Sequence, residues 1–136
     1  TLERNRALVE AASNIRFHSG IPESDLLSMY QSASILLVPF KDGTANNSVL
    51  EAAACGLPAI TTDIGGIRDY VDDACAVLCK PCDAECMADA VIMLLKNVEK
   101  LERMGRLARQ SAERFSWPLV AAAMKDAYAK VFYDAG

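Results

Sequence analysis

The sequence predicts an α/β domain in which a doubly wound parallel sheet is flanked by helices. Short apolar runs at 35–38, 59–62 and 74–79 alternate with segments of helical periodicity. The run at 35–38 is apolar at every position, which is typical of a strand covered on both faces. Strands that alternate with helices in this way pair in parallel and carry helices on both faces of the sheet.

The N-terminal part is expected to form two helices around one strand. Residues 1–12 place apolar side chains among charges, as in an amphipathic helix, and residues 15–18 alternate as a strand. Pro22 and Ser24 introduce a second helix that runs to about residue 32, with Ser24 as its N-cap.

The middle of the chain starts a new helix after a polar loop at 41–46. This helix is predicted over Asn47–Ala54, where Gly56 ends it and Pro58 prevents it from resuming. We then expect a buried strand at 59–62, a turn at 63–66, a short helix at 67–71, a strand at 74–79, and helices at about 83–96, 98–114 and 117–133, with Gly105 and the junction at 116–118 as interruptions.

Length and composition fit one domain. The chain has 136 residues, 52% apolar and 24% charged, and its net charge of -4 argues against nucleic acid, which binds clustered Lys and Arg. No apolar stretch reaches the roughly 18 residues of a spanning helix, and no signal segment opens the chain, so we expect a cytoplasmic protein. Because Thr1 lies in an apparently helical sequence without an initiator Met, we expect residues 1–136 to be one domain of a longer two-domain chain, lacking its first strand or strands.

Four of the five cysteines fall in one short segment, at Cys75, Cys79, Cys82 and Cys86. The two-residue gap between Cys79 and Cys82 is compatible with a metal or iron-sulfur site. A strand from 74 to 79 would however separate Cys75 and Cys79 by about 13 Å, at ~3.3 Å per residue. We therefore expect free thiols, with Cys55 as a small core residue.

The helix predicted over Asn47–Ala54 presents Asn47 and Glu51 on one face, because they are four residues apart. Amides at a helix N-terminus suit phosphates, and a nearby carboxylate can accept hydrogen bonds from sugar hydroxyls. The alternative is that Asn46 and Asn47 only start the helix and that Glu51 is solvated. The face expected to pack holds Leu50, Ala53 and Ala54.

Two loops follow predicted strands, at 41–46 and 63–66, and ligands of open α/β sheets bind at the carboxyl ends of the strands. Gly65 and Gly66 permit a close backbone approach to phosphate, although an ordinary turn explains them equally.

Three segments follow one another along nearly the whole chain: FHSGIPESDLLSMYQSASILLVPF, NNSVLEAAACGLPAITTDIGGIRDYV and ERFSW. In order and spacing they resemble the C-terminal, donor-binding domain of retaining glycosyltransferases of the GT-B type, glycosyltransferase family 4 or group 1. The resemblance implies a Rossmann-like half of a two-domain hexosyltransferase of carbohydrate or polysaccharide biosynthesis. Such an enzyme transfers sugar from a nucleoside-diphosphate sugar with retention, and needs neither a metal nor another cofactor.

The resemblance also assigns residues. It implies that Glu51 binds the donor ribose and that the amides at Asn46, Asn47 and Ser48 hold the diphosphate or the sugar. The loop of Ser19, Gly20 and Ile21 would lie near the base, and the remaining donor-binding positions are Gly43, Thr44, Gly65 and Gly66.

One departure from the family pattern concerns catalysis. The family's second acidic residue stands eight positions before Glu51, and that position is Gly43 here. Asp42 is adjacent and is the candidate substitute, although a shift of one residue moves a carboxylate by about 3.5 Å. The catalytic residue is therefore left unassigned.

The resemblance further implies a missing N-terminal acceptor domain, which would carry any peripheral membrane contact. The Arg and Lys that grip the diphosphate would come from an earlier segment of the chain, after an upstream strand. Lys41 is the nearby cation in this chain, and the chain alone is expected to be inactive. The apolar helix at 117–133 either crosses to that domain, as in GT-B enzymes, or packs in this core. Two rival functions stay open: a noncatalytic nucleotide-binding or assembly domain, favoured by Gly43, and a nucleotide-sugar epimerase.

Overall fold

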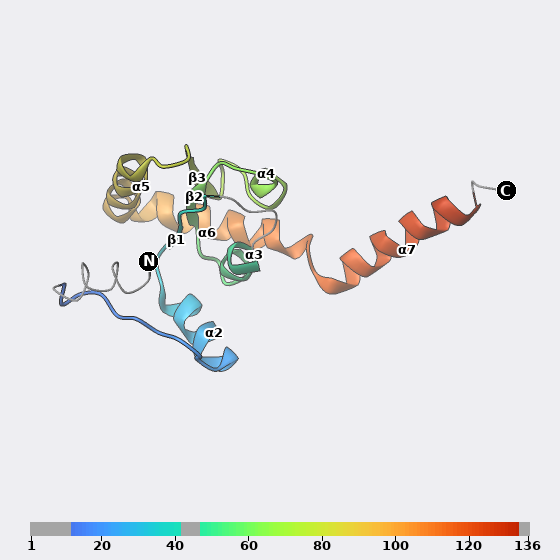
Figure 1. The fold of residues 1–136 in the computed structure, drawn as a ribbon, viewed down its shortest axis with the longest axis horizontal. Helices are drawn as coiled ribbons and strands as arrows, with labels where there is room; N and C mark the ends of the chain where they lie inside the picture. Colours follow the sequence, from blue (N-terminus) through green and yellow to red (C-terminus); the bar gives the residue numbers. More distant parts are fainter. Residues whose placement is uncertain (1–11, 42–46, 134–136) are drawn as a thin grey trace.

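The computed structural model describes residues 12–41 and 47–133. Within these residues, three short parallel strands form one sheet in the order β1-β2-β3 (Figure 1). The register pairs Leu36 with Ala59 and Ala59 with Ala76. The elements are α2 (Glu23–Ser32), β1 (Leu36–Val38), α3 (Asn47–Ala54), β2 (Ala59–Thr62), α4 (Ile67–Tyr70), β3 (Ala76–Cys79), α5 (Ala84–Lys96), α6 (Val98–Glu113) and α7 (Trp117–Tyr133).

The two faces of the sheet bury separate clusters of apolar side chains, because successive residues of a strand point to opposite faces. On one face, Ala59 of β2 packs with residues of α3 and α4. On the other face, Ile60 packs with Met87, Ala90 and Leu94 of α5. Helix α6 contributes to both clusters, with Ala108 in the first and Met104 in the second. The expected doubly wound arrangement is confirmed.

Strand β2 lies in the centre of the sheet and is buried at all four positions. Its two threonine hydroxyls are hydrogen-bonded, as buried polar groups must be. The Thr61 hydroxyl donates to the carbonyl of Val38 at 3.0 Å, and the Phe40 amide donates to Thr62 Oγ1 at 3.0 Å. The two hydrogen bonds thus connect the end of β1 and the residues after it with the carboxyl end of β2.

Helix α3 ends as the sequence predicts. Gly56 has φ +77°, the left-handed conformation that glycine adopts without strain. The Gly56 amide donates to the Ala53 carbonyl at 2.9 Å, and the Leu57 amide donates to the Ala52 carbonyl at 2.9 Å. This pair of bonds is a Schellman motif, which satisfies the last carbonyls of the helix.

Gly105 has a different role from the one expected. It does not interrupt the helix but is buried within α6, where a Cβ atom would collide with the carbonyl oxygen of Gly56. The absence of a side chain therefore lets α6 approach the end of α3 closely. Periodicity along the sequence carries no information about such an approach between two elements.

Most element boundaries agree with the sequence prediction, including those of α3, β2 and the last three helices, to within one or two residues. The strand expected at 15–18 is wrong, because these residues are exposed and irregular and pair with no strand in the described part of the chain. Ser24 is not the N-cap of α2, because the helix begins at Glu23 and the Pro22 carbonyl accepts from the amides of Asp25 and Leu26.

Three expectations about packing also need correction. Leu37 in β1 retains 49% of its accessible surface, so this edge strand is not covered on both faces. Strand β3 begins at Ala76, because Cys75 belongs to the preceding turn and its amide bonds to the Asp72 carbonyl. The buried residues of α3 are Val49, Ala52 and Ala53, whereas Leu50 is half-buried and Ala54 is exposed.

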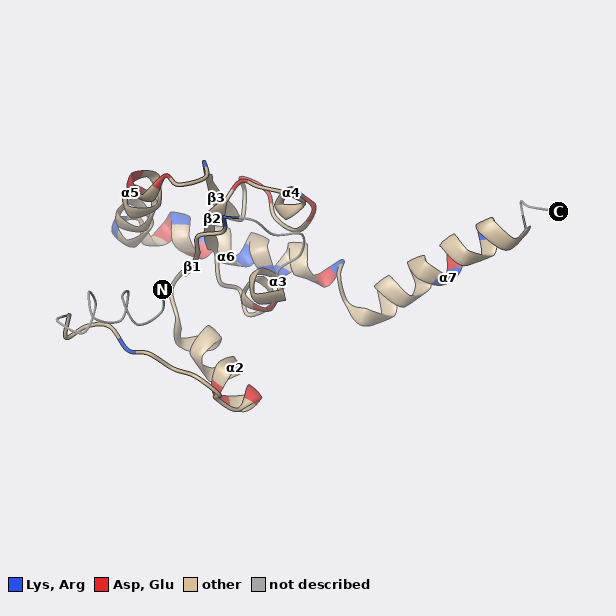
Figure 2. Ribbon diagram, in the orientation of Figure 1, with Lys and Arg blue, Asp and Glu red and all other residues tan. Residues whose placement is uncertain are grey.

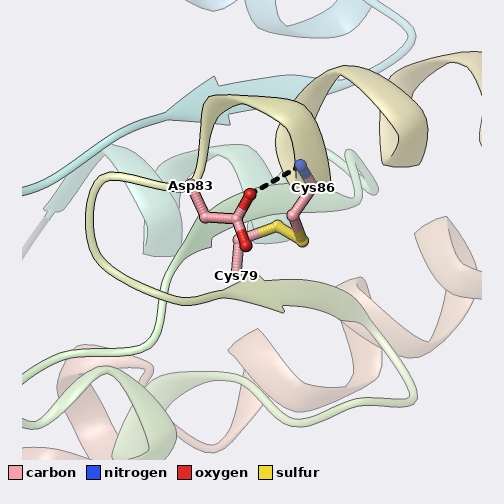
Figure 3. The surroundings of a disulfide bond; sticks show 3 residues. All are labelled: Cys79, Asp83 and Cys86. Carbon is pink, nitrogen blue, oxygen red and sulfur yellow. Dashed lines mark hydrogen bonds between the residues drawn. A yellow bond between two sulfur atoms is a disulfide. The ribbon is translucent and has the colours of Figure 1, made fainter.

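The expectation of free thiols is wrong for two cysteines, because Cys79 and Cys86 form a disulfide (Figure 3). Cys79 ends β3, and Cys86 lies in the first turn of α5, where its amide donates to the Asp83 carboxylate at 2.9 Å. The intervening turn includes Cys82 at φ 62° and brings the two Cα atoms to 6.0 Å, within the range that a disulfide spans. Cys55, Cys75 and Cys82 are free, and Cys55 is only half-buried.

Helix α7 extends away from the rest of the molecule (Figure 1). No residue of α7 whose burial the structure describes is buried, and Trp117 retains 84% of its accessible surface. The prediction of a helix here is confirmed, but the alternative of an ordinary core helix is not. Among helices of the described ranges, α7 included, none combines the length and apolarity that crossing a membrane requires.

Candidate functional site

The candidate site begins where α3 follows the carboxyl end of β1. The described structure places Asn47 in the first turn of α3 and Glu51 one turn later, and both are exposed. They share the open face of the helix, as predicted. The loop that precedes α3 lies outside the described residues, and with it lie the predicted site residues Asp42, Gly43, Thr44 and Asn46. Lys41, the last described residue before it, is exposed.

A hollow of about 520 Å³ lies beside this face of α3. Its walls come from α3, from the end of α6 and from the start of α7. It is lined by Asn47, Leu50, Glu51, Ala54, Arg109, Ala112, Glu113, Phe115, Ser116 and Trp117.

Arg109 is a cation in this hollow that sequence reasoning missed. Its guanidinium donates to the carbonyl of Ala54 at 2.7 Å, at the end of α3, where a basic side chain satisfies an otherwise unpaired carbonyl. Arg109 follows the buried Ala108 on α6. The sequence signal was therefore its place beside the packing face of a helix, but nothing in the sequence showed that α6 lies against α3.

A second hollow, of about 500 Å³, lies between α2 and α3. It is lined by Glu23, Ser24, Leu26, Leu27, Tyr30, Glu51, Ala54 and Cys55. Across it the Tyr30 hydroxyl donates to Glu51 Oε2 at 3.1 Å. The sequence did not point to this contact, because the spacing of residues within one helix does not show which side chains of another helix they meet.

The environment of Tyr30 raises the pKa of its phenol. Partial burial is the main cause, because it disfavours the phenolate. The Glu51 carboxylate acts in the same direction, through its hydrogen bond and its charge, whereas a hydrogen bond from Ser48 opposes them. Tyr30 thus interacts with two of the residues that the resemblance assigns to the donor.

The turn at 63–66 follows β2 at the same carboxyl edge. Gly65 has φ +55°, and Gly66 precedes α4 without a side-chain cap. The Arg68 guanidinium donates two hydrogen bonds to the carboxylate of Asp63, the first residue of the turn. Nε lies 2.9 Å from Oδ1, and Nη2 lies 2.7 Å from Oδ2. This hydrogen-bonded guanidinium lowers the pKa of the Asp63 carboxyl.

The structure thus brings Glu51, Asn47 and Ser48 together on α3, and adds Tyr30 and Arg109. Ser19, Gly20 and Ile21 lie before α2, with Gly20 at φ +63° in open space. Within the described ranges, no hydrogen bond joins these loop residues, or Gly65 and Gly66, to the α3 residues. In the same ranges there is no group of three or more His, Cys, Asp or Glu side chains placed to hold a metal ion.

The fold and the position of this site define the Rossmann-like half of a GT-B protein. Residues 1–111 match the family model of glycosyl transferases group 1, and the chain belongs to this family. It is 33% identical over 134 residues to D-inositol 3-phosphate glycosyltransferase of Saccharomonospora viridis, covering 93% of this chain and 31% of the relative. The chain thus spans about a third of the length of such relatives.

Solved structures show the same fold. Sucrose-phosphate synthase from Thermosynechococcus elongatus superposes with a TM-score of 0.85 at 26% identity, covering 98% of this chain and 35% of that one. Anabaena HepE, solved in complex with UDP and glucose, superposes with a TM-score of 0.79 at 15% identity, covering 95% of this chain and 35% of that one. At that identity the second likeness concerns the fold alone.

Proposed function

We propose that this chain binds the donor in a retaining glycosyltransferase that uses a nucleoside-diphosphate sugar and no metal ion. Membership of the family supports sugar transfer. The observation that carries the proposal is Glu51: an exposed carboxylate one turn into the helix that follows the carboxyl end of β1, beside an open hollow. This is where open α/β sheets bind their ligands.

The chemistry of the reaction explains what the site must supply. The leaving nucleoside diphosphate gains negative charge in the transition state, while the sugar gains oxocarbenium character. Backbone amides at the start of a helix are suited to a diphosphate or a sugar, and we assign this role to Asn46, Asn47 and Ser48. The Glu51 carboxylate accepts hydrogen bonds from the ribose hydroxyls.

The other donor contacts follow the same edge. We assign Ser19, Gly20 and Ile21 to the base, and Gly43, Thr44, Gly65 and Gly66 to the phosphate and sugar. Asp42 is the candidate for the acidic role that Gly43 cannot fill. The acceptor site and further phosphate-binding cations are assigned to another part of the full-length protein, because this chain spans about a third of its relatives.

Helix α7 supports this two-part organisation. None of its side chains whose burial is described is buried, and Phe132 and Trp117 retain 76% and 84% of their accessible surface. Its charged residues are only Lys125, Asp126 and Lys130 (Figure 2). In keeping with the resemblance, we assign α7 to the contact with the acceptor domain.

Calorimetric titration of the full-length protein with UDP, GDP and ADP tests the proposal. One of these nucleotides is expected to bind, and Glu51→Ala is expected to weaken it by about 1.5 to 3 kcal/mol, the usual range for hydrogen bonds to a charged group. Glu85→Ala is the matched control, because Glu85 lies in the first turn of α5, which packs on the opposite face of the sheet. It should leave the affinity unchanged.

Equal affinity of Glu51→Ala and wild type would contradict the ribose role. Absence of binding at millimolar nucleotide would favour the noncatalytic rival in its form as an assembly domain, whereas the glycine at position 43 favours either noncatalytic form. Incubation with a nucleotide sugar separates the third candidate, because an epimerase forms an isomeric sugar without an acceptor, whereas a transferase needs one.

A further inference from the structure

We propose that Tyr30 is a positioning residue, whose hydroxyl holds the Glu51 carboxylate in the orientation that receives the ribose. This inference rests on the proposed function of Glu51. It assigns α2 a part in nucleotide recognition beyond the loop that precedes it.

The contact joins two helices. Tyr30 lies near the end of α2 and Glu51 in the middle of α3, and the hydroxyl oxygen is 3.1 Å from Glu51 Oε2. An ionised carboxylate has about four sites that accept hydrogen bonds. The bond to Tyr30 occupies one of them and leaves Oε1 for the ribose hydroxyls.

The need for positioning follows from the exposure of Glu51. A glutamate on an open helix face samples several rotamers, and ordering such a side chain on binding weakens affinity by about two- to tenfold. Tyr30 is half-buried in the hollow between the helices, and its planar ring has few rotamers of its own. A hydrogen bond from this ring orders the carboxylate before the nucleotide arrives.

The packing of α2 indicates that Tyr30 contributes more than general stability. Helix α2 contains no buried residue, so Tyr30 is not part of the apolar core. Its hydroxyl interacts with Ser48 as well as Glu51, and both belong to the face of α3 assigned to the donor.

The test combines Tyr30→Phe with a change in the ligand. In the full-length protein, calorimetry compares UDP, or whichever of GDP and ADP binds, with its 2′,3′-dideoxy analogue. Tyr30→Phe is expected to weaken the binding of the ribose nucleotide about two- to tenfold. It should leave the affinity for the dideoxy analogue unchanged. If Tyr30 had a merely structural role, the substitution would weaken the binding of both nucleotides equally. That result would overturn the proposal.

Three comparisons sharpen the result. Tyr30→Phe combined with Glu51→Ala should bind no more weakly than Glu51→Ala alone, because Tyr30 acts through Glu51. Tyr128→Phe makes the same chemical change on α7, which is assigned to the acceptor domain and not to the donor, and should leave the ratio of the two nucleotide affinities unchanged. Glu51→Ala must itself lose affinity for the ribose nucleotide and not for the dideoxy analogue.

The possible failures are distinguishable. If Glu51→Ala does not discriminate between the two nucleotides, the ribose role of Glu51 fails, and the role of Tyr30 fails with it. If Glu51→Ala discriminates but Tyr30→Phe does not, only the role of Tyr30 is overturned. Because each comparison is made within one variant, a loss of stability in Tyr30→Phe does not obscure the outcome.

Discussion

At the scale of single residues, side-chain hydrogen bonds fix the backbone at the carboxyl edge of the sheet. The Thr62 hydroxyl accepts the Phe40 amide just before the loop at 42–46. The Asp63 amide donates to the Cys79 carbonyl at 2.7 Å, so the next loop is tied to β3. Phe40 and Asp63, which follow β1 and β2 directly in the described part of the chain, are therefore both held at this edge by hydrogen bonds.

The ion pair between Asp63 and Arg68 gives a prediction of pH dependence. The pKa of Asp63 is lowered in the folded protein, so its contribution to stability is present above the ordinary value of about 3.9 and is lost as the pH falls through the folded value. We expect Arg68→Gln to return the pKa of Asp63 toward that ordinary value, as measured by NMR titration of the carboxyl carbon.

The stability difference between wild type and Arg68→Gln should be present at neutral pH and vanish in acid. It should also shrink in high salt, because both side chains are partly exposed. A difference that persists at a pH well below the folded pKa would mean that Arg68 acts through packing. Asp126→Asn, on the exposed helix α7, controls for a general effect of removing one charge.

At the scale of elements, the close approach of α6 to the end of α3 supports the site, because Arg109 reaches Ala54 from α6. We expect Gly105→Ala to lower the free energy of unfolding by about 1–3 kcal/mol, the usual cost of overpacking. The added Cβ would meet the Gly56 carbonyl oxygen, which is backbone and cannot rotate away. Urea denaturation measures the change.

Helix propensity alone would make the same substitution stabilising by about 1 kcal/mol. The sign of the effect therefore decides between collision and propensity. Gln110→Ala, at an exposed position of α6, raises propensity without a collision and should not destabilise the protein. A Gly105→Ala protein as stable as wild type would show that the two helices separate at little cost.

Helix boundaries were predictable because their signals are local. Gly56 and Pro58 end α3, and the acceptor side chains of Asp83 and Asn97 cap α5 and α6. The expected strand at 15–18 failed because a strand needs a partner, which local alternation does not supply. The disulfide was missed because a separation of 7 residues says nothing about the turn that folds Cys86 back onto Cys79.

At the scale of the whole molecule, the packed sheet and its helices contrast with the projecting helix α7 (Figure 1). We expect Phe132→Ala to change the free energy of unfolding of the 136-residue chain by no more than about 0.5 kcal/mol. Leu94→Ala is the comparison, because Leu94 is 0% exposed, and it should cost about 2–5 kcal/mol. Urea denaturation of both variants measures the difference.

In the full-length protein, the assignment of α7 to the acceptor domain predicts that Phe132→Ala becomes destabilising. A loss above about 1 kcal/mol in the 136-residue chain would instead mean that α7 folds back onto this core. An effect absent from both proteins would contradict the proposed contact.

The sequence by itself determined the class of fold, the order of the helices and strands from α2 to α7, and the shared exposed face of Asn47 and Glu51. These features depend on periodicity, helix caps and turns. Each of these signals comes from residues that lie close together in the sequence. Only the tertiary structure placed Tyr30 on Glu51, Arg109 on Ala54 and Gly105 on Gly56. The residues in each of these contacts are far apart in the sequence, and the smallest separation is the 21 positions between Tyr30 and Glu51. Such contacts are therefore decided by how the elements pack.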